Sequence, residues 1–267
     1  MSKLVNALVN MRALEELTEK STIIHGLHPM VKMTTTLVYL IVVISFDKYD
    51  LNGLIPFAAY PVLMLALSET PYKPLFSRLL IALPFSIFAG LSNIFFEQSL
   101  AVYLFGIPIS FGFISFSSII FKTLLTVMAV LILVSTTQTT KLAHELIRMK
   151  VPKIVVLQMM LTYRYISVLI EETASMITAY HMRSPRQKGI AMADMGTFAG
   201  QLLLRTFAKA DRIYYAMKCR GFDGEYRFAA SDKLRTTDII YMIVLISFFI
   251  GMRVIPIGNI LGGQIAF

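Results

Sequence analysis

Five apolar segments, interrupted by one long basic region, constrain this chain more than any other feature of its sequence. They lie at about 33–46, 51–67, 79–96, 114–135 and 237–252. A helix needs about 20 mostly apolar residues to cross a bilayer, so segments of this size predict membrane-spanning helices. Only 15% of the residues are charged and the mean hydropathy is +0.68, whereas an average globular chain has about 25% charged residues. We therefore expect an all-α, polytopic membrane protein with about five transmembrane helices.

Two of the apolar stretches contain residues that disturb a regular helix. Pro56 and Pro61 interrupt the second segment, and we expect kinks there because proline removes a backbone hydrogen bond. The apolar stretch 100–135 is too long for one span of about 20 residues, and its first part contains Gly106 and Pro108. This part is expected to form a short hairpin or re-entrant piece that leads into the fourth span.

Lys122 lies inside the fourth predicted span. A lysine at the centre of a span costs on the order of 3 kcal/mol on insertion scales. One interpretation is a charge on a substrate path, since intramembrane charges are often functional. We favour the simpler alternatives, in which the ammonium extends to the membrane surface or is paired inside the helix bundle.

The positive charge is concentrated in one part of the chain. Residues 141–235 hold 16 of the 25 Lys and Arg residues and 8 of the 16 Asp and Glu residues, which is +8 of the net +9. Basic regions beside membrane spans usually face the cytoplasm, so the N-terminus, the loop 68–78 and region 136–235 are predicted to be cytoplasmic. The basic side chains alternate with long apolar faces, a pattern that favours contacts with membrane and protein over nucleic acid.

These patterns suggest three parts. Residues 1–135 are expected to form an amphipathic N-terminal helix and a four-span membrane domain, 136–235 a cytoplasmic domain of long helices, and 236–267 a C-terminal transmembrane helix. The amphipathic helix is expected at about 3–20, where Glu15, Glu16 and Glu19 argue against a cleavable signal peptide.

The basic region is predicted to be helical throughout. A short helix follows Thr139 and Thr140 and ends near Val151. A second helix is expected to begin with Pro152 in its first turn and to reach about Met182. A third helix is expected to have Asp194 as its N-cap and Gly221 just after its end, at a position that favours glycine.

The ends of the two longer helices are alike in sequence. One reads Ala179-Tyr-His-Met-Arg183-Ser184, and the other reads Ala216-Met-Lys-Cys-Arg220-Gly221. An arginine in a last turn interacts favourably with the helix dipole, which is explanation enough for a single case. Two such arginines, each followed by a small residue, also suit docking on carboxylates of a partner, because a guanidinium binds a carboxylate in bidentate fashion.

Other motifs point away from catalysis by this chain. It has no G-x-x-x-x-G-K-[ST] segment, so no P-loop ATP site is expected. The four histidines are scattered and Cys219 is the single cysteine. His25 and His28 are therefore interpreted as part of a turn that ends at Pro29, and we expect no catalytic, cofactor or metal-binding residue. A metalloprotease is disfavoured because no apolar span contains a histidine.

Several matching segments give the chain a resemblance to a known family. They are Thr136-Thr137, Tyr163-Arg164-Tyr165, Met182-Arg183-Ser184 and Ala216-Met217-Lys218-Cys219-Arg220-Gly221-Phe222. The chain resembles the transmembrane T component of energy-coupling factor (ECF) transporters, in the CbiQ-like cobalt and nickel branch. The resemblance covers most of the chain and is densest over 136–228. Family members usually have Ala-Arg-Gly or a close variant where this chain has Met-Arg-Ser and Cys-Arg-Gly.

The resemblance implies a non-catalytic scaffold in a bacterial or archaeal cell membrane, where it joins two ABC-type ATPase subunits to a substrate-binding S component. ATP would be bound by the ATPase subunits, and a small accessory membrane subunit is a further possible partner. The docking residues implied for the ATPases are Met182, Arg183, Ser184, Cys219, Arg220 and Gly221. The surface implied for the S component includes Met159, Met160, Tyr163, Arg164, Phe207 and Tyr214.

The cargo stays open at this point. The resemblance favours cobalt or nickel ions, but vitamin systems share the same scaffold, and the cargo site is expected on another chain. An autonomous channel or secondary transporter is the less favoured alternative, because few polar groups besides Lys122 lie within the spans.

Overall fold

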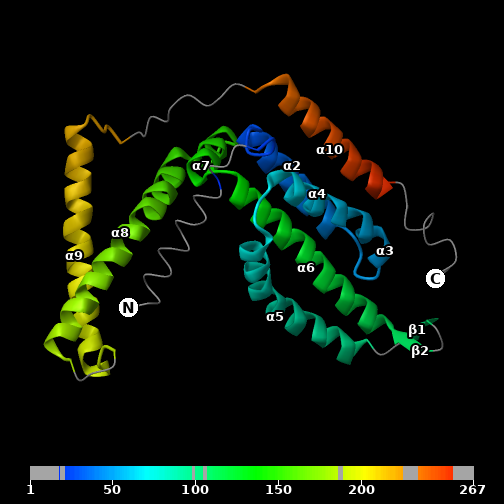
Figure 1. The fold of residues 1–267 in the computed structure, drawn as a ribbon, viewed down its shortest axis with the longest axis horizontal. Helices are drawn as coiled ribbons and strands as arrows, with labels where there is room; N and C mark the ends of the chain where they lie inside the picture. Colours follow the sequence, from blue (N-terminus) through cyan, green and yellow to red (C-terminus); the bar gives the residue numbers. More distant parts are fainter. Residues whose placement is uncertain are drawn as a thin grey trace. The chain divides into compact units, whose positions relative to one another are not determined.

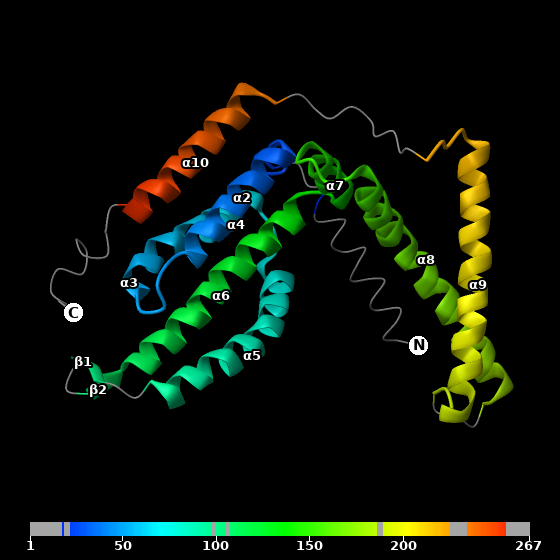
Figure 2. The same cartoon turned by 180° about the vertical axis from the view of Figure 1, so that it is seen from behind.

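The computed structural model describes residues 18, 22–97, 100–104, 107–185, 189–224 and 234–254. The predicted N-terminal helix at 3–20 lies outside the described residues, apart from Thr18. The chain divides into two compact units, which are treated separately below (Figures 1 and 2). The bundle unit is Leu17–Gln138 with Asp232–Phe267, and the α7–α9 unit is Thr139–Ser231 with Met1–Glu16.

The bundle unit is built from helices and one small hairpin. Its elements are α2 (Pro29–Ile44), α3 (Leu51–Leu54), η1 (Ile55–Ala58), α4 (Ala59–Ser68), α5 (Tyr72–Phe96), β1 (Leu100–Leu104), β2 (Ile107–Ser110), α6 (Phe111–Thr136) and α10 (Thr236–Val254). The predicted all-α class is confirmed, and the antiparallel β1–β2 pair is the hairpin expected before the fourth span. The predicted interruption at Pro56 is also confirmed, because the 3₁₀ helix η1 separates α3 from α4 there.

Five helical segments among the described residues are long and apolar enough to cross a membrane. They are Leu51–Ser68, Tyr72–Phe95, Phe111–Thr136, Lys153–Arg183 and Thr236–Val254. The number of candidate membrane-spanning segments is therefore the predicted five, but one of the five differs from the prediction. Helix α2 has only 16 residues, or about 24 Å against a hydrocarbon core of about 30 Å. The long helix from Lys153 qualifies in its place because its first half is strongly apolar.

Aromatic side chains from four elements form the centre of the bundle core. Tyr39 of α2 lies with its ring centroid 4.6 Å from that of Tyr60 on α4 and 5.3 Å from that of Phe249 on α10. Its hydroxyl donates a hydrogen bond of 3.0 Å to the carbonyl of Phe57 in η1. Since buried aromatic pairs stabilise beyond their area and a buried hydroxyl needs a partner, this cluster fixes α2, η1, α4 and α10 together.

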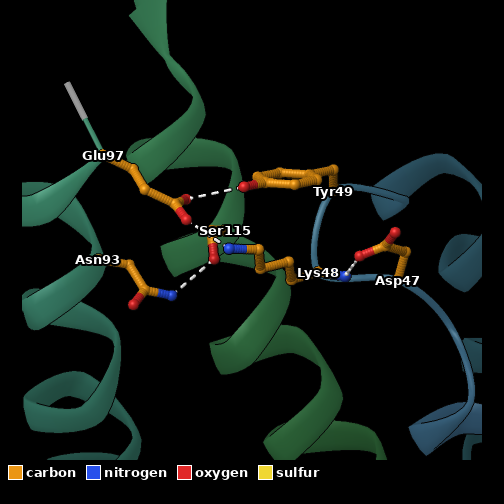
Figure 3. Close-up of polar contacts among 6 residues, drawn as sticks. All are labelled: Asp47, Lys48, Tyr49, Asn93, Glu97 and Ser115. Atoms are coloured by element: carbon orange, nitrogen blue, oxygen red, sulfur yellow. Dashed lines mark hydrogen bonds and ion pairs between the residues drawn. The ribbon is translucent and has the colours of Figure 1, made fainter. Parts of the chain in front are cut away.

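Helices α5 and α6 pack closely through small residues at one end. Gly112 leaves no room for a side chain, because an added Cβ would lie 2.5 Å from the carbonyl oxygen of Asn93 and 2.7 Å from that of Glu97. Nearby, the Asn93 amide donates to the Ser115 hydroxyl at 2.7 Å (Figure 3). A glycine and a serine at the contact allow the two backbones to approach, as is common for helices that pack within membranes.

A polar cluster joins the α2–α3 loop to the end of α5. The Lys48 ammonium forms an ion pair with Glu97, and the Tyr49 hydroxyl donates to the other Glu97 oxygen at 3.0 Å (Figure 3). The hydrogen bond from Lys48 holds the pKa of the Glu97 carboxyl below its usual value. The cluster therefore keeps its charges paired at neutral pH.

Two cations from other helices bind backbone carbonyl groups at the C-cap of α2 and in the loop that follows it. Lys122 of α6 donates to the carbonyl of Phe46 at 2.6 Å and to that of Asp47 at 3.3 Å. Arg253 of α10 donates to the carbonyl of Ser45 at 3.2 Å, and its guanidinium lies 4.2 Å from the Phe46 ring centroid. Cations near a helix C-terminus interact favourably with its unpaired carbonyls. Lys122 is thus paired with backbone carbonyls of the loop after α2, within the two alternatives favoured from the sequence.

Buried charged groups also hold the opposite end of α2, and the sequence did not point to them. Lys32 is 2% exposed and donates to the carbonyl of Thr136, the last residue of α6, at 2.8 Å. Asp238 is 3% exposed and accepts from the backbone N–H groups of Arg235 and His28, at 2.9 and 3.3 Å. Buried charges require such partners, so these contacts tie α2 to α6 and α10.

Candidate functional site

The α7–α9 unit contains three helices: α7 (Thr139–Arg148), α8 (Lys153–Arg183) and α9 (Met192–Cys219). The predicted second helix is confirmed to within one residue, although Pro152 occupies the N-cap position instead of the first turn. Its 31 residues make α8 about 46 Å long. The apolar side chains of Val156 and Leu157, near its start, are buried, whereas the other residues of α8 are half-exposed or exposed.

The start of α9 differs from its prediction. The helix begins at Met192 with Ala191 as its N-cap, so the assignment of Asp194 as N-cap was wrong. The Asp194 carboxylate accepts a hydrogen bond of 2.7 Å from the Tyr180 hydroxyl on α8, and the same hydroxyl accepts from the Ala191 N–H at 3.2 Å. This side chain is thus bound to another helix instead of capping its own, while its charge still suits a first turn.

The end of α9 is a Schellman motif, as the glycine predicted. Gly221 has φ +81, its N–H donates to the carbonyl of Lys218 at 3.0 Å, and the N–H of Phe222 donates to that of Met217 at 3.1 Å. Both bonds satisfy carbonyls that the helix leaves unpaired. A positive φ of this kind is readily adopted by glycine and not by other residues, so Gly221 fixes where α9 stops and where Arg220 stands.

The end of α8 has a different geometry. Ser184 has φ −132 and ψ 67, and its N–H donates to the carbonyl of Tyr180 at 3.0 Å. The helix therefore ends at a residue with negative φ instead of reversing through a left-handed residue. The two helix ends that look alike in sequence are therefore terminated in two different ways.

Both predicted docking arginines are exposed at the very ends of their helices. Arg183 is the last residue of α8 and Arg220 is the C-cap of α9. Neither guanidinium forms a hydrogen bond or ion pair with another residue in the described ranges. Their neighbours are also accessible, since Met182 is 79% exposed and the thiol of Cys219 is free. Each arginine and its neighbours thus form an exposed helix end. We call these two helix ends, at Arg183 and at Arg220, the arginine tips.

The two tips stand at opposite ends of α9. The contact of Tyr180 with Asp194 brings the end of α8 to the start of α9, as the views in Figures 1 and 2 agree. Arg220 lies at the other end of the 28-residue helix, about 42 Å away along its axis. This geometry separates the two arginines by more than the width of a helix pair.

Charged contacts join α8 to α9 between these tips. Glu172 on α8 accepts from Arg205 on α9 at 2.6 Å and lies 3.9 Å from the ammonium of Lys209. Sequence reasoning placed these residues on polar faces but did not pair them. A usable signal was present, because Arg205 and Lys209 are four residues apart and therefore lie on one face of α9.

An open apolar groove of about 290 Å³ lies beside this contact. Its lining includes Tyr165, Val168 and Leu169 of α8 and Leu203, Phe207 and Ile213 of α9. Of the six residues implied for the S-component surface, Phe207 belongs to this groove. The other five are Met159, Met160, Tyr163 and Arg164 on α8 and Tyr214 on α9. They are half-exposed or exposed and are not among the residues that line the groove.

The described residues contain no group of three or more His, Cys, Asp and Glu side chains that could hold a metal ion. The arrangement instead offers two exposed cations at defined helix ends and an apolar surface between them.

Five helical segments of membrane-spanning length, of which α8 ends in the exposed Arg183, define a multi-pass membrane protein. The family model of CbiQ, described as a cobalt transport protein, matches residues 20–229. The chain therefore belongs to the CbiQ family.

Curated relatives agree with this assignment. The chain is 26% identical over 256 residues to the energy-coupling factor transporter transmembrane protein EcfT of Streptococcus equi, covering 86% of this chain and 92% of that protein. It is 24% identical over 255 residues to an uncharacterized protein of Methanocaldococcus jannaschii, covering 86% of this chain and 81% of that protein. The predicted resemblance to the T component of ECF transporters is thus confirmed, and the chain is a transporter membrane subunit.

Proposed function

We propose that this chain is the T component of an ATP-driven uptake transporter and couples two ABC-type ATPase subunits to a substrate-binding S component. The α7–α9 unit is assigned to the cytoplasm, where the ATPase subunits bind and hydrolyse ATP. The S component carries the cargo site. The family description, cobalt transport protein, supports cobalt ions as the cargo, and nickel follows from the resemblance alone.

The observation that carries this proposal is the position of the two arginines. Arg183 and Arg220 are exposed, have no partner among the described residues and stand at opposite ends of α9. Two cations about 42 Å apart along a helix suit one contact with each of two separate subunits. Each guanidinium would dock on carboxylates in a groove of one ATPase subunit, where a bidentate pair gives both strength and orientation.

A second candidate cargo is a vitamin presented by a different S component. The likeness to EcfT, which covers 86% of this chain, leaves this candidate open, because that name specifies the transporter class and no cargo. Measuring uptake of cobalt, nickel and vitamins with the S components of the same organism separates the two candidates.

The test of docking is co-purification of the ATPase subunits with the full chain. We expect the double variant Arg183→Ala/Arg220→Ala to lose the ATPase subunits, because truncation of one partner in a buried charge pair costs about 2–5 kcal/mol. Arg212→Ala is the matched control, since Arg212 is an exposed arginine within α9 whose guanidinium bonds to its own helix.

The control is expected to retain the ATPase subunits fully. Undiminished binding by the double variant would contradict the assignment of the two arginines, and absence of binding by the unmodified chain would contradict the proposed function itself.

A further inference from the structure

The contact between α8 and α9 follows one antiparallel register. Glu172 meets Arg205 and Lys209, and two turns further along α8 Tyr180 meets Asp194. Toward the other end, α8 residues from Tyr165 share the apolar groove with α9 residues up to Ile213. Residues later in α8 contact residues earlier in α9, so the two helices run antiparallel along their shared contact.

Apolar burial is too slight to fix this contact. None of the residues of α9 is buried, and in the groove Leu203 and Phe207 are still 56% and 62% exposed. The hydrophobic effect stabilises in proportion to the area removed from water and is not directional. A precise position of α9 on α8 therefore needs directional contacts, which charged and hydroxyl groups supply.

Glu172 is placed to provide such a contact. Its two carboxylate oxygens face two cations on consecutive turns of α9, with Arg205 at 2.6 Å from one and Lys209 at 3.9 Å from the other. Contacts with two turns limit both sliding and rotation of α9. Along α8, Glu172 lies about 16 Å from Arg183, and along α9, Arg205 lies about 22 Å from Arg220, at 1.5 Å per residue.

We infer that Glu172, held between Arg205 and Lys209, is a positioning residue that fixes the crossing of α8 and α9 and so transmits motion from one arginine tip to the other. This inference rests on the proposed function. Without the ion pair the tips still bind the ATPase subunits, because Arg183 and Arg220 are unchanged. Helices α8 and α9 then shift relative to each other when the ATPase subunits close, and less of the motion reaches the S component.

The test compares ATP-driven uptake with ATPase co-purification in the full complex. Glu172→Gln and Arg205→Glu are each expected to lower uptake at least fivefold while the amount of bound ATPase stays within twofold of the unmodified chain. The charge-swapped double variant Glu172→Arg/Arg205→Glu is expected to restore at least half of the uptake. Asp211→Asn is the matched control on α9, with no contact to α8 among the described residues, and should leave uptake unchanged.

Restoration by the charge swap distinguishes an ion pair from a general structural effect of either substitution. The inference is overturned if Glu172→Gln transports normally, or if the double variant transports no better than the weaker single variant. If the unmodified chain binds no ATPase subunit, the proposed function fails instead, so the two failures are distinguishable.

Discussion

At the scale of single residues, backbone angles and individual charges decide how the helix ends are presented. Gly221 turns the chain at φ +81 immediately after Arg220. Arg253 binds the carbonyl of Ser45, the C-cap of α2, and Lys122 binds that of Phe46 in the loop that follows. Each acts at or just after a helix end, where backbone groups lack partners within the helix. Substituting one of these residues is therefore expected to affect the stability of the structure close to it.

Gly221→Ala is expected to loosen the end of α9. A left-handed backbone costs an L-residue about 1–2 kcal/mol, so the two capping hydrogen bonds open about 5- to 30-fold more often. Hydrogen exchange of the amides at positions 221 and 222 measures this opening. In the control Gly196→Ala the glycine is within a helix with open space around it, and α9 should become slightly more stable because alanine favours helix. Equal protection in both variants would contradict the account of this helix end.

Lys122→Met is expected to destabilise the bundle. The carbonyl of Phe46 would lose its charged partner, and hydrogen bonds to charged groups contribute about 1.5–3 kcal/mol. The midpoint of thermal unfolding in detergent should fall, while ATPase binding is retained because the arginine tips are unaffected. An unchanged midpoint combined with complete loss of uptake would instead support a place for Lys122 on a substrate path.

At the scale of elements, close approach and polar pairing set how helices meet. Helices α5 and α6 meet at Gly112, where a side chain has no space. Helices α8 and α9 meet through Glu172 and Tyr180, with no buried residue on α9. The first contact is set by close packing, and the second by directional contacts between polar groups that are accessible to water.

Gly112→Ala is expected to destabilise the bundle by about 1–3 kcal/mol, the usual cost of overpacking a close contact. For a chain of this size that lowers the unfolding midpoint by several degrees, at about 2–4 °C per kcal/mol. Gly251→Ala in α10 is the control, since nothing lies within 4 Å of an added Cβ there. A midpoint that falls equally in both variants would show that the Gly112 contact has no special role.

The elements also show which features were predictable from the sequence. Local chemistry was sufficient for the Gly221 end of α9, the 3₁₀ break at Pro56 and the β1–β2 hairpin. It failed for Asp194, whose partner Tyr180 lies on another helix. The buried bond of Lys32 joins residues 104 positions apart. A pattern of neighbouring residues contains no information on such distant partners. For Glu172, the spacing of Arg205 and Lys209 indicated a cationic face on α9 but not which residue of α8 would meet it.

At the scale of the whole molecule, the chain is a membrane subunit of the CbiQ family that combines five segments of membrane-spanning length with two exposed arginine tips. The sequence already placed the charge in one region and singled out Arg183 and Arg220. The structure adds that the two are terminated differently and stand at opposite ends of α9. In the proposed transporter this separation assigns one tip to each ATPase subunit.

The most direct measurement of this account is ATP-dependent uptake in vesicles reconstituted with the chain, its ATPase subunits and the S component, with radioactive cobalt as the cargo. The account predicts uptake by the complete set, none by the chain alone, and none when Arg183→Ala/Arg220→Ala replaces the unmodified chain, while Arg212→Ala transports normally. Cobalt flux through the chain without ATPase subunits, or full uptake by the double variant, would contradict it.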